Sequence, residues 1–259
     1  MLAPIAGLGN AITRRVSRFG ALARFFSQAL SAWGSLPQAG RRVTLRVFLN
    51  QVWFTALQAI PLTVILSGIL SFLVISQAIR ELGRLGATEL IGTLIVVAIV
   101  RELGPLLTAL AVAGRSGTAI ATELATNKVM GEVDALEGMG IDPVHYLVLP
   151  RFLASVVSVF CLIIVFDLVA VFAGLVAAAA NGMSADRYID IVLRSLSFAD
   201  AGLTLAKGVV FGLIIGTVPT FYGLAVRRAA TDVPVASSGA VVVSILAIFL
   251  CSAIFVALS

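Results

Sequence analysis

Charged residues are scarce in this chain: Lys, Arg, Asp and Glu make up 12% of its 259 residues, against roughly 25% in ordinary soluble domains. Cysteine is scarce too, since Cys161 and Cys251 are the only two, and both lie in apolar stretches without the spacing of metal ligands. We therefore expect neither a disulfide nor a metal site. A G-x-x-x-x-G-K-[ST] loop is absent, so the chain is not expected to bind and hydrolyse a nucleotide itself. These shortages argue against a soluble enzyme, and we expect no catalytic residue.

Hydrophobic residues, in contrast, make up 60% of the chain. A membrane span needs about 20 mainly apolar residues, and five stretches are long enough: 47–79, 90–114, 152–180, 208–226 and 233–259. The bilayer admits only helices and closed barrels, and the alternating segments typical of barrel strands are missing. The sequence therefore predicts an all-α integral membrane protein with five transmembrane helices, in one membrane domain over residues 1–259.

The distribution of Lys and Arg predicts the orientation of these spans. With five spans, residues 1–46, 115–151 and 227–232 lie on one side, and they hold 12 of the 18 basic residues. Because basic residues favour the cytoplasmic side, we expect a cytoplasmic N-terminus and a C-terminus outside. The net charge of +5 then favours contact with anionic lipid over nucleic-acid binding.

The region before the core, residues 1–46, is predicted to lie on the membrane surface. Residues 10–33 place apolar side chains at spacings of three and four, with arginines on the other face. This pattern is typical of an interfacial amphipathic helix, and a soluble helix of another domain is the alternative. The transmembrane core, 47–259, opens with a stretch that is longer than one crossing needs. We expect Pro61 to divide it into an entering elbow up to about residue 60 and a first crossing over about 61–79.

The fourth span carries a small-residue face. Gly208, Gly212 and Gly216 are four residues apart, which lets two helices approach closely in a membrane. The pattern alone leaves open whether this face packs within the subunit or between subunits. Pro219 is expected to kink or end the same helix.

The segment 114–151 between the second and third spans is too polar to cross a membrane and is patterned at helical spacing. An amphipathic helix held against the membrane face by two spans is a docking surface whose apolar stripe needs a partner. The alternative is a helix that folds back on the base of the protein itself.

Here the sequence resembles a known family. The stretch "VRELGPLLTALAVAGRSGTAIATELATNKVMGEVDALEGMGIDPVHYLVLPR" at 100–151, with "LSGILSFLVISQ" at 66–77 and "AKGVVFG" at 206–212, strongly resembles the MlaE (YrbE-type) permease family. The likeness runs nearly end to end. Members of that family are the membrane subunits of ABC transporters that move phospholipids between bacterial membranes.

The resemblance implies a set of partners and a location. We expect a homodimer in the bacterial inner membrane that maintains outer-membrane lipid asymmetry, bound to a cytoplasmic ABC ATPase dimer and to a periplasmic hexamer of an MCE-domain protein. ATP and Mg would be held by the partner ATPase, and no cofactor by this chain. In the family the cytoplasmic helix between the second and third spans couples to the ATPase, and it maps to about Glu123–Met139. Its candidate coupling residues are Glu123, Lys128, Glu132, Val133, Asp134, Leu136, Glu137 and Met139.

Charges inside the spans mark the candidate substrate site. Arg101 and Glu102 are adjacent in the second span, Asp167 is alone in the third, and Lys207 lies at the outer end of the fourth. Charged groups at membrane depth are costly and usually have partners. Arg101 and Glu102 point about 100° apart on a helix, so each is expected to pair elsewhere, and either an Arg101–Asp167 or a Glu102–Lys207 pair is compatible with the sequence.

Three interpretations of Arg101 and Glu102 compete: an ion-pair network that sets helix register, a proton or ion relay, and a polar contact in a lipid-binding cavity. In the third, cationic donors meet a phosphate beside an apolar trough, and the resemblance puts such a pocket at the homodimer interface. Pro105, which lacks an N–H, frees the carbonyl of residue 101 and would open that wall. The predicted substrate-binding residues are Leu70, Val74, Gln77, Arg101, Glu102, Leu103, Asp167 and Lys207. An ion-coupled secondary transporter and a non-transporting membrane scaffold are the alternative functions.

Overall fold

The computed structural model describes residues 41–87, 90–227 and 229–258, together with Gly20, Arg24, Phe25 and Ser27. Throughout these residues the regular secondary structure is helical, which confirms the predicted all-α class. The interfacial helix predicted over 10–33 falls almost entirely outside the described residues and stays a prediction.

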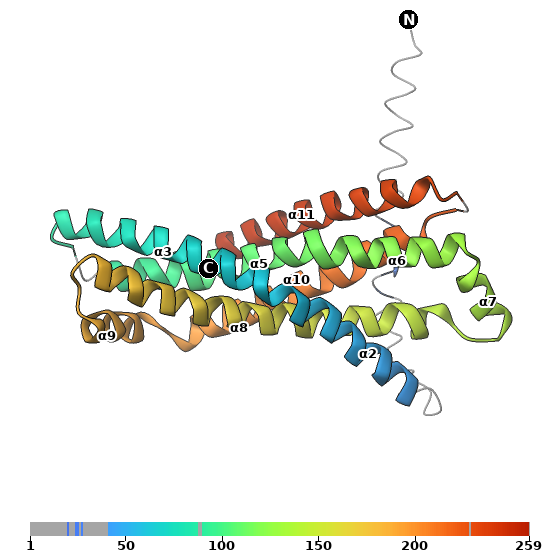
Figure 1. The fold of residues 1–259 in the computed structure, drawn as a ribbon, viewed down its shortest axis with the longest axis horizontal. Helices are drawn as coiled ribbons and strands as arrows, with labels where there is room; N and C mark the ends of the chain where they lie inside the picture. The colour runs from blue at the N-terminus through green and yellow to red at the C-terminus, as the bar shows by residue number, and fades with distance from the viewer. Residues whose placement is uncertain are drawn as a thin grey trace, which may run out of the picture.

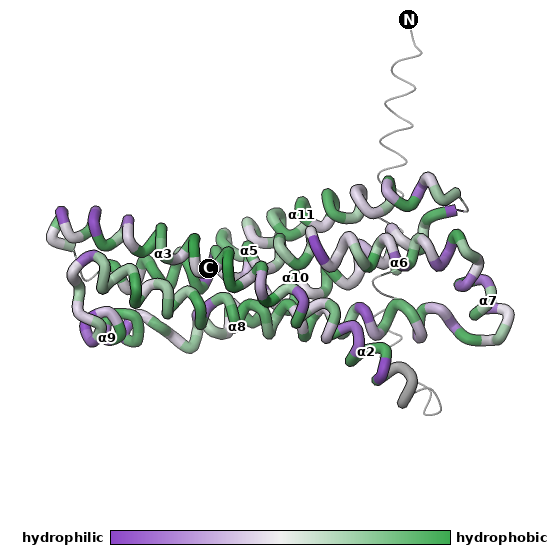
Figure 2. Tube along the Cα trace, in the orientation of Figure 1, coloured by the Kyte–Doolittle hydropathy of each residue, from purple (hydrophilic) through white to green (hydrophobic). Residues whose placement is uncertain are grey.

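Five helical segments are long and apolar enough to cross a membrane, as predicted. In chain order they are Leu45–Arg84, Leu90–Val129, Val144–Ala180, Phe198–Leu224 and Asp232–Leu258. Figure 1 shows most of them running along the long axis of the molecule, with α7 (Glu132–Gly138) at one end and α9 (Ala185–Ser195) at the other. Hydrophobic residues occupy most of their length, and hydrophilic residues gather towards the two ends (Figure 2).

The first segment is divided where the sequence predicts. Helix α2 (Arg41–Ala56) is followed by a single 3-10 turn, η3 (Leu57–Ala59), and by α3 (Ile60–Arg84). Pro61 stands in the first turn of α3, where its missing N–H costs no helical hydrogen bond. Figure 1 shows α2 leaving the bundle obliquely. The division is therefore confirmed, whereas the role of α2 as an interfacial elbow stays a prediction.

The second segment changes helical type along its length. It runs through α4 (Leu90–Leu94), η4 (Ile95–Leu103), α5 (Gly104–Val112), η5 (Ala113–Gly117) and α6 (Thr118–Val129), and both η4 and η5 are π-helical. Stretches of π-helix are rare and often occur at functional sites. Beyond the apolar stretch that ends near residue 114, α6 continues the helix, with Ile120 and Leu124 fully buried, and it packs against α10 and α11.

The third and fourth segments pack closely within the chain. They are η6 (Val144–Val148) with α8 (Leu149–Ala180), and α10 (Phe198–Leu224); α11 (Asp232–Leu258) follows. A Cβ atom placed on Gly212 would lie 2.5 Å from the Cα of Val156, and one on Gly216 would lie 2.8 Å from the Cα of Phe152. The small-residue face of α10 therefore packs against α8 of the same chain, which resolves the alternative that the sequence left open.

Of the two outcomes expected for Pro219, a kink or the end of the helix, the structure excludes the second. Helix α10 continues through Pro219 and ends at Leu224. Pro219 is buried, and its ring lies against the backbone of η5, where a Cβ atom on Gly117 would be 3.3 Å from Pro219 Cγ. Neighbouring helices in a membrane bundle can accommodate a proline inside a helix.

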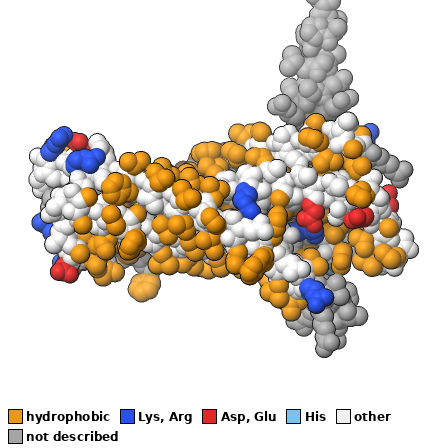
Figure 3. Space-filling view, in the orientation of Figure 1, with side chains coloured by type: hydrophobic (Ala, Val, Ile, Leu, Met, Phe, Trp, Pro, Cys, Tyr) orange, Lys and Arg blue, Asp and Glu red, His pale blue; other side chains and the backbone are white. Residues whose placement is uncertain are grey.

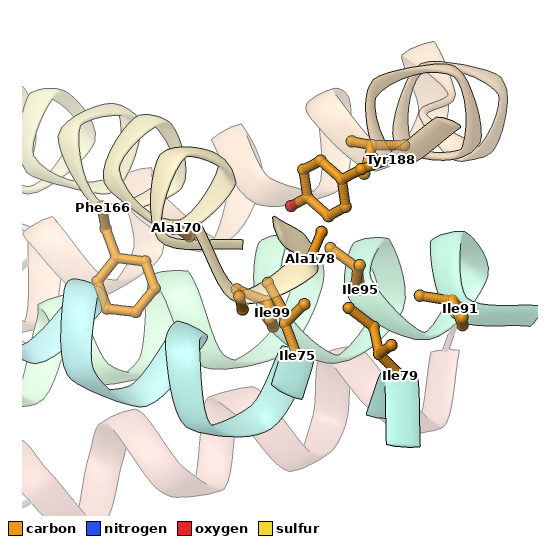
Figure 4. Packing of buried hydrophobic residues seen from close by; sticks show 11 residues of the cluster. Ile75, Ile79, Ile91, Ile95, Ile99, Phe166, Ala170, Ala178 and Tyr188 are labelled. Carbon is orange, nitrogen blue, oxygen red and sulfur yellow. The ribbon is translucent and has the colours of Figure 1, made fainter. Parts of the chain in front are cut away.

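A hydrophobic cluster fills the α9 end of the bundle (Figure 4). Ile75 from α3, Ile95 and Ile99 from η4 and Phe166 from α8 are almost completely buried in it. Tyr188 from α9 closes the cluster and donates a hydrogen bond from its hydroxyl to the carbonyl of Val171 at 3.3 Å. Burial raises the pKa of the Tyr188 hydroxyl to about 12. This packing gives the π-helical stretch η4 a rigid support.

Candidate functional site

Lys207 and Glu102 form the tightest ion pair inside the spans of the described chain. The Nζ of Lys207, on α10, lies 2.6 Å from Oε1 of Glu102, on η4, and only 1% of the Lys207 side chain is exposed. Of the two pairs that the sequence allowed, the structure therefore forms Glu102–Lys207. Both residues lie in helical segments that are long and apolar enough to cross a membrane.

Lys207 also explains how the backbone tolerates Pro105. In a regular α-helix the N–H of residue 105 would bond to the carbonyl of residue 101, and proline has no N–H. Lys207 Nζ donates to the carbonyl oxygen of Arg101 at 2.8 Å instead. The carbonyl that Pro105 frees is therefore satisfied by an ammonium group from the fourth span, and the opening of the wall stays a prediction.

Arg101 has a looser partner that the sequence reasoning missed. Its NH1 lies 3.9 Å from Oδ1 of Asp200, near the start of α10, and its buried Nε has no acceptor. Asp200 also accepts a hydrogen bond from the backbone N–H of Ser197 at 3.1 Å as part of a capping box. The Ser197-x-x-Asp200 spacing predicts the start of the helix, but it does not predict the contact with Arg101. We call Arg101, Glu102, Asp200 and Lys207 the Lys207 cluster.

Asp167 does not join the Lys207 cluster. Its Oδ1 is buried without a hydrogen-bond partner, and it faces the second segment, because a Cβ atom on Gly104 would lie 2.6 Å from it. The alternative Arg101–Asp167 ion pair is therefore wrong. The structure leaves this carboxyl group beside the backbone of α5, without an ionic partner among the described residues.

The apolar residues predicted for the same site are divided between two environments. Val74 and Leu103 pack against the hydrophobic cluster at the α9 end, and Leu70 is half-buried on α3. Gln77 is exposed, and its Oε1 accepts a hydrogen bond from Arg80 at 2.9 Å. Val74 thus packs against the cluster that contains Ile95 and Ile99 of η4, and Leu103 is itself the last residue of η4. Gln77, in contrast, belongs to the polar end of α3.

The predicted coupling helix is broken in two. Gly131 adopts the left-handed conformation with φ +78°, so α6 ends at Val129 and α7 spans only Glu132–Gly138. A single helix over Glu123–Met139 is therefore wrong. The turn is held by an ion pair of 2.6 Å between Lys128 Nζ and Asp134 Oδ1.

The apolar stripe of this region faces inwards. Val133 is 3% exposed and packs with Ile120, Leu124 and Leu147, and Leu136 is packed against the same cluster. These contacts bear out the alternative in which the helix folds back on the base of the protein. The outward apolar groups are Met130 and Met139, which are 70% and 67% exposed; the sequence reasoning missed the first.

The acidic candidates at this end have different surroundings. Glu123, on α6, pairs with the buried Arg151, on α8, with 2.7 Å between Oε1 and NH2, and Arg151 NH1 donates to the carbonyl of Leu147 at 2.8 Å. We call Glu123 and Arg151 the Arg151 pair. Glu132 and Glu137 are exposed. The outer surface of the α7 end therefore carries exposed carboxylates and methionines.

Charged side chains on one face of the molecule lie mostly towards its two ends, and a broad hydrophobic band separates them (Figure 3). This distribution is typical of a protein whose middle faces lipid.

Comparison with known proteins agrees with these observations. The profile of the family described as Permease MlaE matches residues 48–258. A Rickettsia typhi protein named as a probable ABC transporter permease is 33% identical over 199 residues, which cover 76% of this chain and 77% of the relative. A Synechocystis protein with the same kind of name is 32% identical over 210 residues, with 81% and 80% covered.

A plant protein is also similar. The Arabidopsis thaliana chloroplastic protein named TRIGALACTOSYLDIACYLGLYCEROL 1 is 31% identical over 226 residues, which cover 83% of this chain and 65% of the plant protein.

Proposed function

The chain belongs to the MlaE permease family of ABC transporters, and from this premise we propose that it is the membrane subunit through which such a transporter moves phospholipid between bacterial membranes. We place it in the inner membrane as a homodimer, with its N-terminus in the cytoplasm and its C-terminus in the periplasm. An ABC ATPase dimer holding ATP and Mg binds at the α7 end, and a hexameric MCE-domain protein lies at the α9 end. Transport then maintains outer-membrane lipid asymmetry.

The lipid proposal rests on the different lengths of the two ion pairs in the Lys207 cluster. Glu102 and Lys207 are 2.6 Å apart, whereas Arg101 and Asp200 are 3.9 Å apart and one donor of Arg101 has no acceptor. Guanidinium groups bind phosphate through paired hydrogen bonds. Arg101 is thus the cation best able to exchange its partner for a lipid phosphate, while Lys207 and Glu102 hold η4 in place.

The acyl chains need an apolar wall, and the residues beside Arg101 can supply it. Leu103 and Val74 are partly buried at the edge of the hydrophobic cluster, and Leu70 is half-buried on the same helix as Val74. A homodimer would close this wall from the other side. Ligand sites of this kind combine a mainly apolar lining with a few placed polar groups.

Coupling to the ATPase is proposed to use the exposed surface of α7 and its flanking turns. Met130 and Met139 supply flexible apolar contacts, and Glu132 and Glu137 add negative charge beside them. The second helical segment runs without a break in helical structure from Leu90 to Val129, so displacement at its α7 end reaches Arg101 through a continuous element. ATP binding to the partner would in this way change the lipid site.

The test is lipid transfer by the complex of this chain with its ATPase and MCE partners in reconstituted vesicles. Arg101→Ala should abolish ATP-dependent transfer of a fluorescent phospholipid while the subunits still co-purify. Arg194→Ala is the matched control, because Arg194 is an exposed arginine on α9 whose one ion pair within the described chain is with Asp190. Unchanged transfer by Arg101→Ala, or loss of assembly, would contradict a role in lipid binding.

The unpaired carboxyl of Asp167 motivates the second candidate, an ion-coupled secondary transporter. In that case the chain alone would move substrate when a proton or sodium gradient is applied, and Asp167→Asn would stop it. Under the ABC proposal the chain alone gives no transfer, and ATP with the partner ATPase restores it. Co-purification without any transport would instead point to a membrane scaffold.

A further inference from the structure

A cavity lies between α2 and the α7 end, far from the Lys207 cluster. It has a volume of about 810 Å³ and is lined by Asn50, Gln51 and Phe54 from α2 and by residues of α6, α7, η6 and α8. Small-molecule sites typically have volumes of roughly 300–1,000 Å³. Glu123, in its wall, is 21 residues beyond Glu102 on the same helical segment, or about 30 Å at 1.5 Å per residue.

The charges in the cavity wall are unbalanced. Arg151 and Glu123 both line it and neutralise each other at 2.7 Å. Glu132 also lines it, is exposed, and makes no ion pair with any described residue. The wall therefore carries one negative charge that a positively charged group of a ligand would balance.

Neutral donors complete the wall. The side chains of Asn50, Asn127 and Tyr146 line the same cavity, and amide and hydroxyl groups can donate hydrogen bonds to phosphate oxygens. The side chain of Arg151 is 6% exposed, and its Nε has no acceptor among the described residues. Arg151 therefore adds positive potential to the wall and keeps one hydrogen-bond donor unpaired. The cavity thus offers an acceptor for a cation and donors for a phosphate.

Helix α2 indicates how a ligand with acyl chains would enter. Its residues Leu45, Leu49 and Trp53 recur every four positions and are 55%, 56% and 62% exposed, whereas Asn50 and Phe54 line the cavity. In a membrane protein this outer face of α2 meets lipid, and tryptophan favours the level of the headgroups. One helix thus separates the lipid from a polar cavity at headgroup depth.

We propose that this cavity binds the headgroup of an aminophospholipid, with the ammonium group at Glu132, the phosphate at the neutral donors opposite, and the acyl chains passing along α2. Lipids whose headgroup carries only negative charge are disfavoured, because they would meet the carboxylate of Glu132 without compensation. With the orientation proposed above, the site samples the inner leaflet and touches α7. It does not depend on substrate binding at the Lys207 cluster.

The experiment uses the full-length chain in nanodiscs without ATPase, with photoreactive phosphatidylethanolamine or phosphatidylglycerol whose acyl chain carries the crosslinker. Crosslinked peptides are mapped by mass spectrometry. We expect phosphatidylethanolamine to label residues 45–54 at least fivefold more than phosphatidylglycerol. Glu132→Gln should remove most of this preference, and Glu132→Lys should reverse it in favour of phosphatidylglycerol.

Glu137→Gln is the matched control, since Glu137 is an exposed glutamate on the same short helix that does not line the cavity. It should keep the preference of the wild type. Equal labelling by both lipids, or equal effects of Glu132→Gln and Glu137→Gln, would overturn the proposal and indicate annular lipid only. Free glycerophosphoethanolamine should not compete at millimolar concentration; if it does, the ligand is a soluble phosphoamine and the lipid assignment is wrong.

Arg101→Ala separates this site from the proposed transport function. The variant should label residues 45–54 as the wild type does, even where lipid transfer is lost. Loss of labelling in Glu132→Gln together with wild-type labelling in Arg101→Ala, both measured without ATPase, would establish two separate lipid sites.

Discussion

The Lys207 cluster and the Arg151 pair both join helices through an arginine or lysine and a glutamate, yet their environments differ. In the Lys207 cluster the lysine is 1% exposed and its glutamate 26% exposed. In the Arg151 pair the arginine is 6% exposed and its glutamate 48% exposed. Charges with little access to water depend on their partners, since the interior solvates them poorly. The first pair is therefore part of the framework, whereas the second leaves a carboxylate at the surface that can respond to a partner.

The largest effect is expected for Lys207→Ala. It leaves Glu102 and the carbonyl of Arg101 without their donor, and breaking a buried ion pair costs about 3–5 kcal/mol. Thermal unfolding in detergent should show a much lower midpoint, and little of the variant should remain folded at 37 °C. The double variant Lys207→Ala, Glu102→Ala should recover part of the loss, because it removes the stranded carboxylate. No recovery would mean that the pair does not set the stability of this region.

A smaller effect is expected for Arg151→Ala. The carbonyl of Leu147 loses its donor, while Glu123 can turn to water, so we expect a loss of about 2 kcal/mol. Urea or thermal unfolding would measure it, with Arg194→Ala as a control on an exposed arginine. A loss as large as that of Lys207→Ala would remove the distinction between the two pairs.

Asp200→Ala tests the looser half of the Lys207 cluster. It removes the capping-box hydrogen bond that Asp200 accepts from the N–H of Ser197, which is worth about 1 kcal/mol, and it frees Arg101. Stability should fall slightly, while the affinity of the reconstituted protein for anionic phospholipid should rise, because Arg101 no longer has a competing carboxylate. Unchanged lipid affinity would show that the Arg101–Asp200 contact does not compete with phosphate.

The smallest effect is expected for Lys128→Ala at the turn between α6 and α7. Asp134 is 43% exposed, and exposed pairs contribute at most about 1 kcal/mol after screening by water and salt. Unfolding should be nearly unchanged, but the ATPase activity of the complex should become less sensitive to lipid if the turn transmits movement. A large loss of stability would mean that the turn is buried in the assembly.

Much of the fold could be predicted because hydrophobic length is a local property of the chain. The five spans and the division of the first one before Pro61 follow from apolar run length and from the missing N–H of proline. The end of the second helix could not be predicted in the same way. Polar residues beyond 114 mark where the apolar stretch stops, but Ile120 and Leu124 continue the helix because α10 and α11 bury one of its faces.

The candidate site shows the same division. Sequence reasoning identified Arg101, Glu102, Asp167 and Lys207 as charges at membrane depth, because the hydrophobic residues around them make them conspicuous. It could not select their partners, and it missed Asp200, whose place at a helix start has an ordinary capping explanation. It also placed Val133 and Leu136 on a docking surface, whereas the turn at Gly131 directs them into the protein.

Composition and apolar run length alone determined that this protein is a helical membrane protein with charges inside its spans. Only the tertiary structure decided that Lys207 meets Glu102, 105 residues away, and that Asp167 meets the backbone near Gly104. The physical reason is that ion pairing in a membrane depends on the rotation of each helix about its axis and on its depth. Both are set by the packing of glycines and aromatic rings between helices.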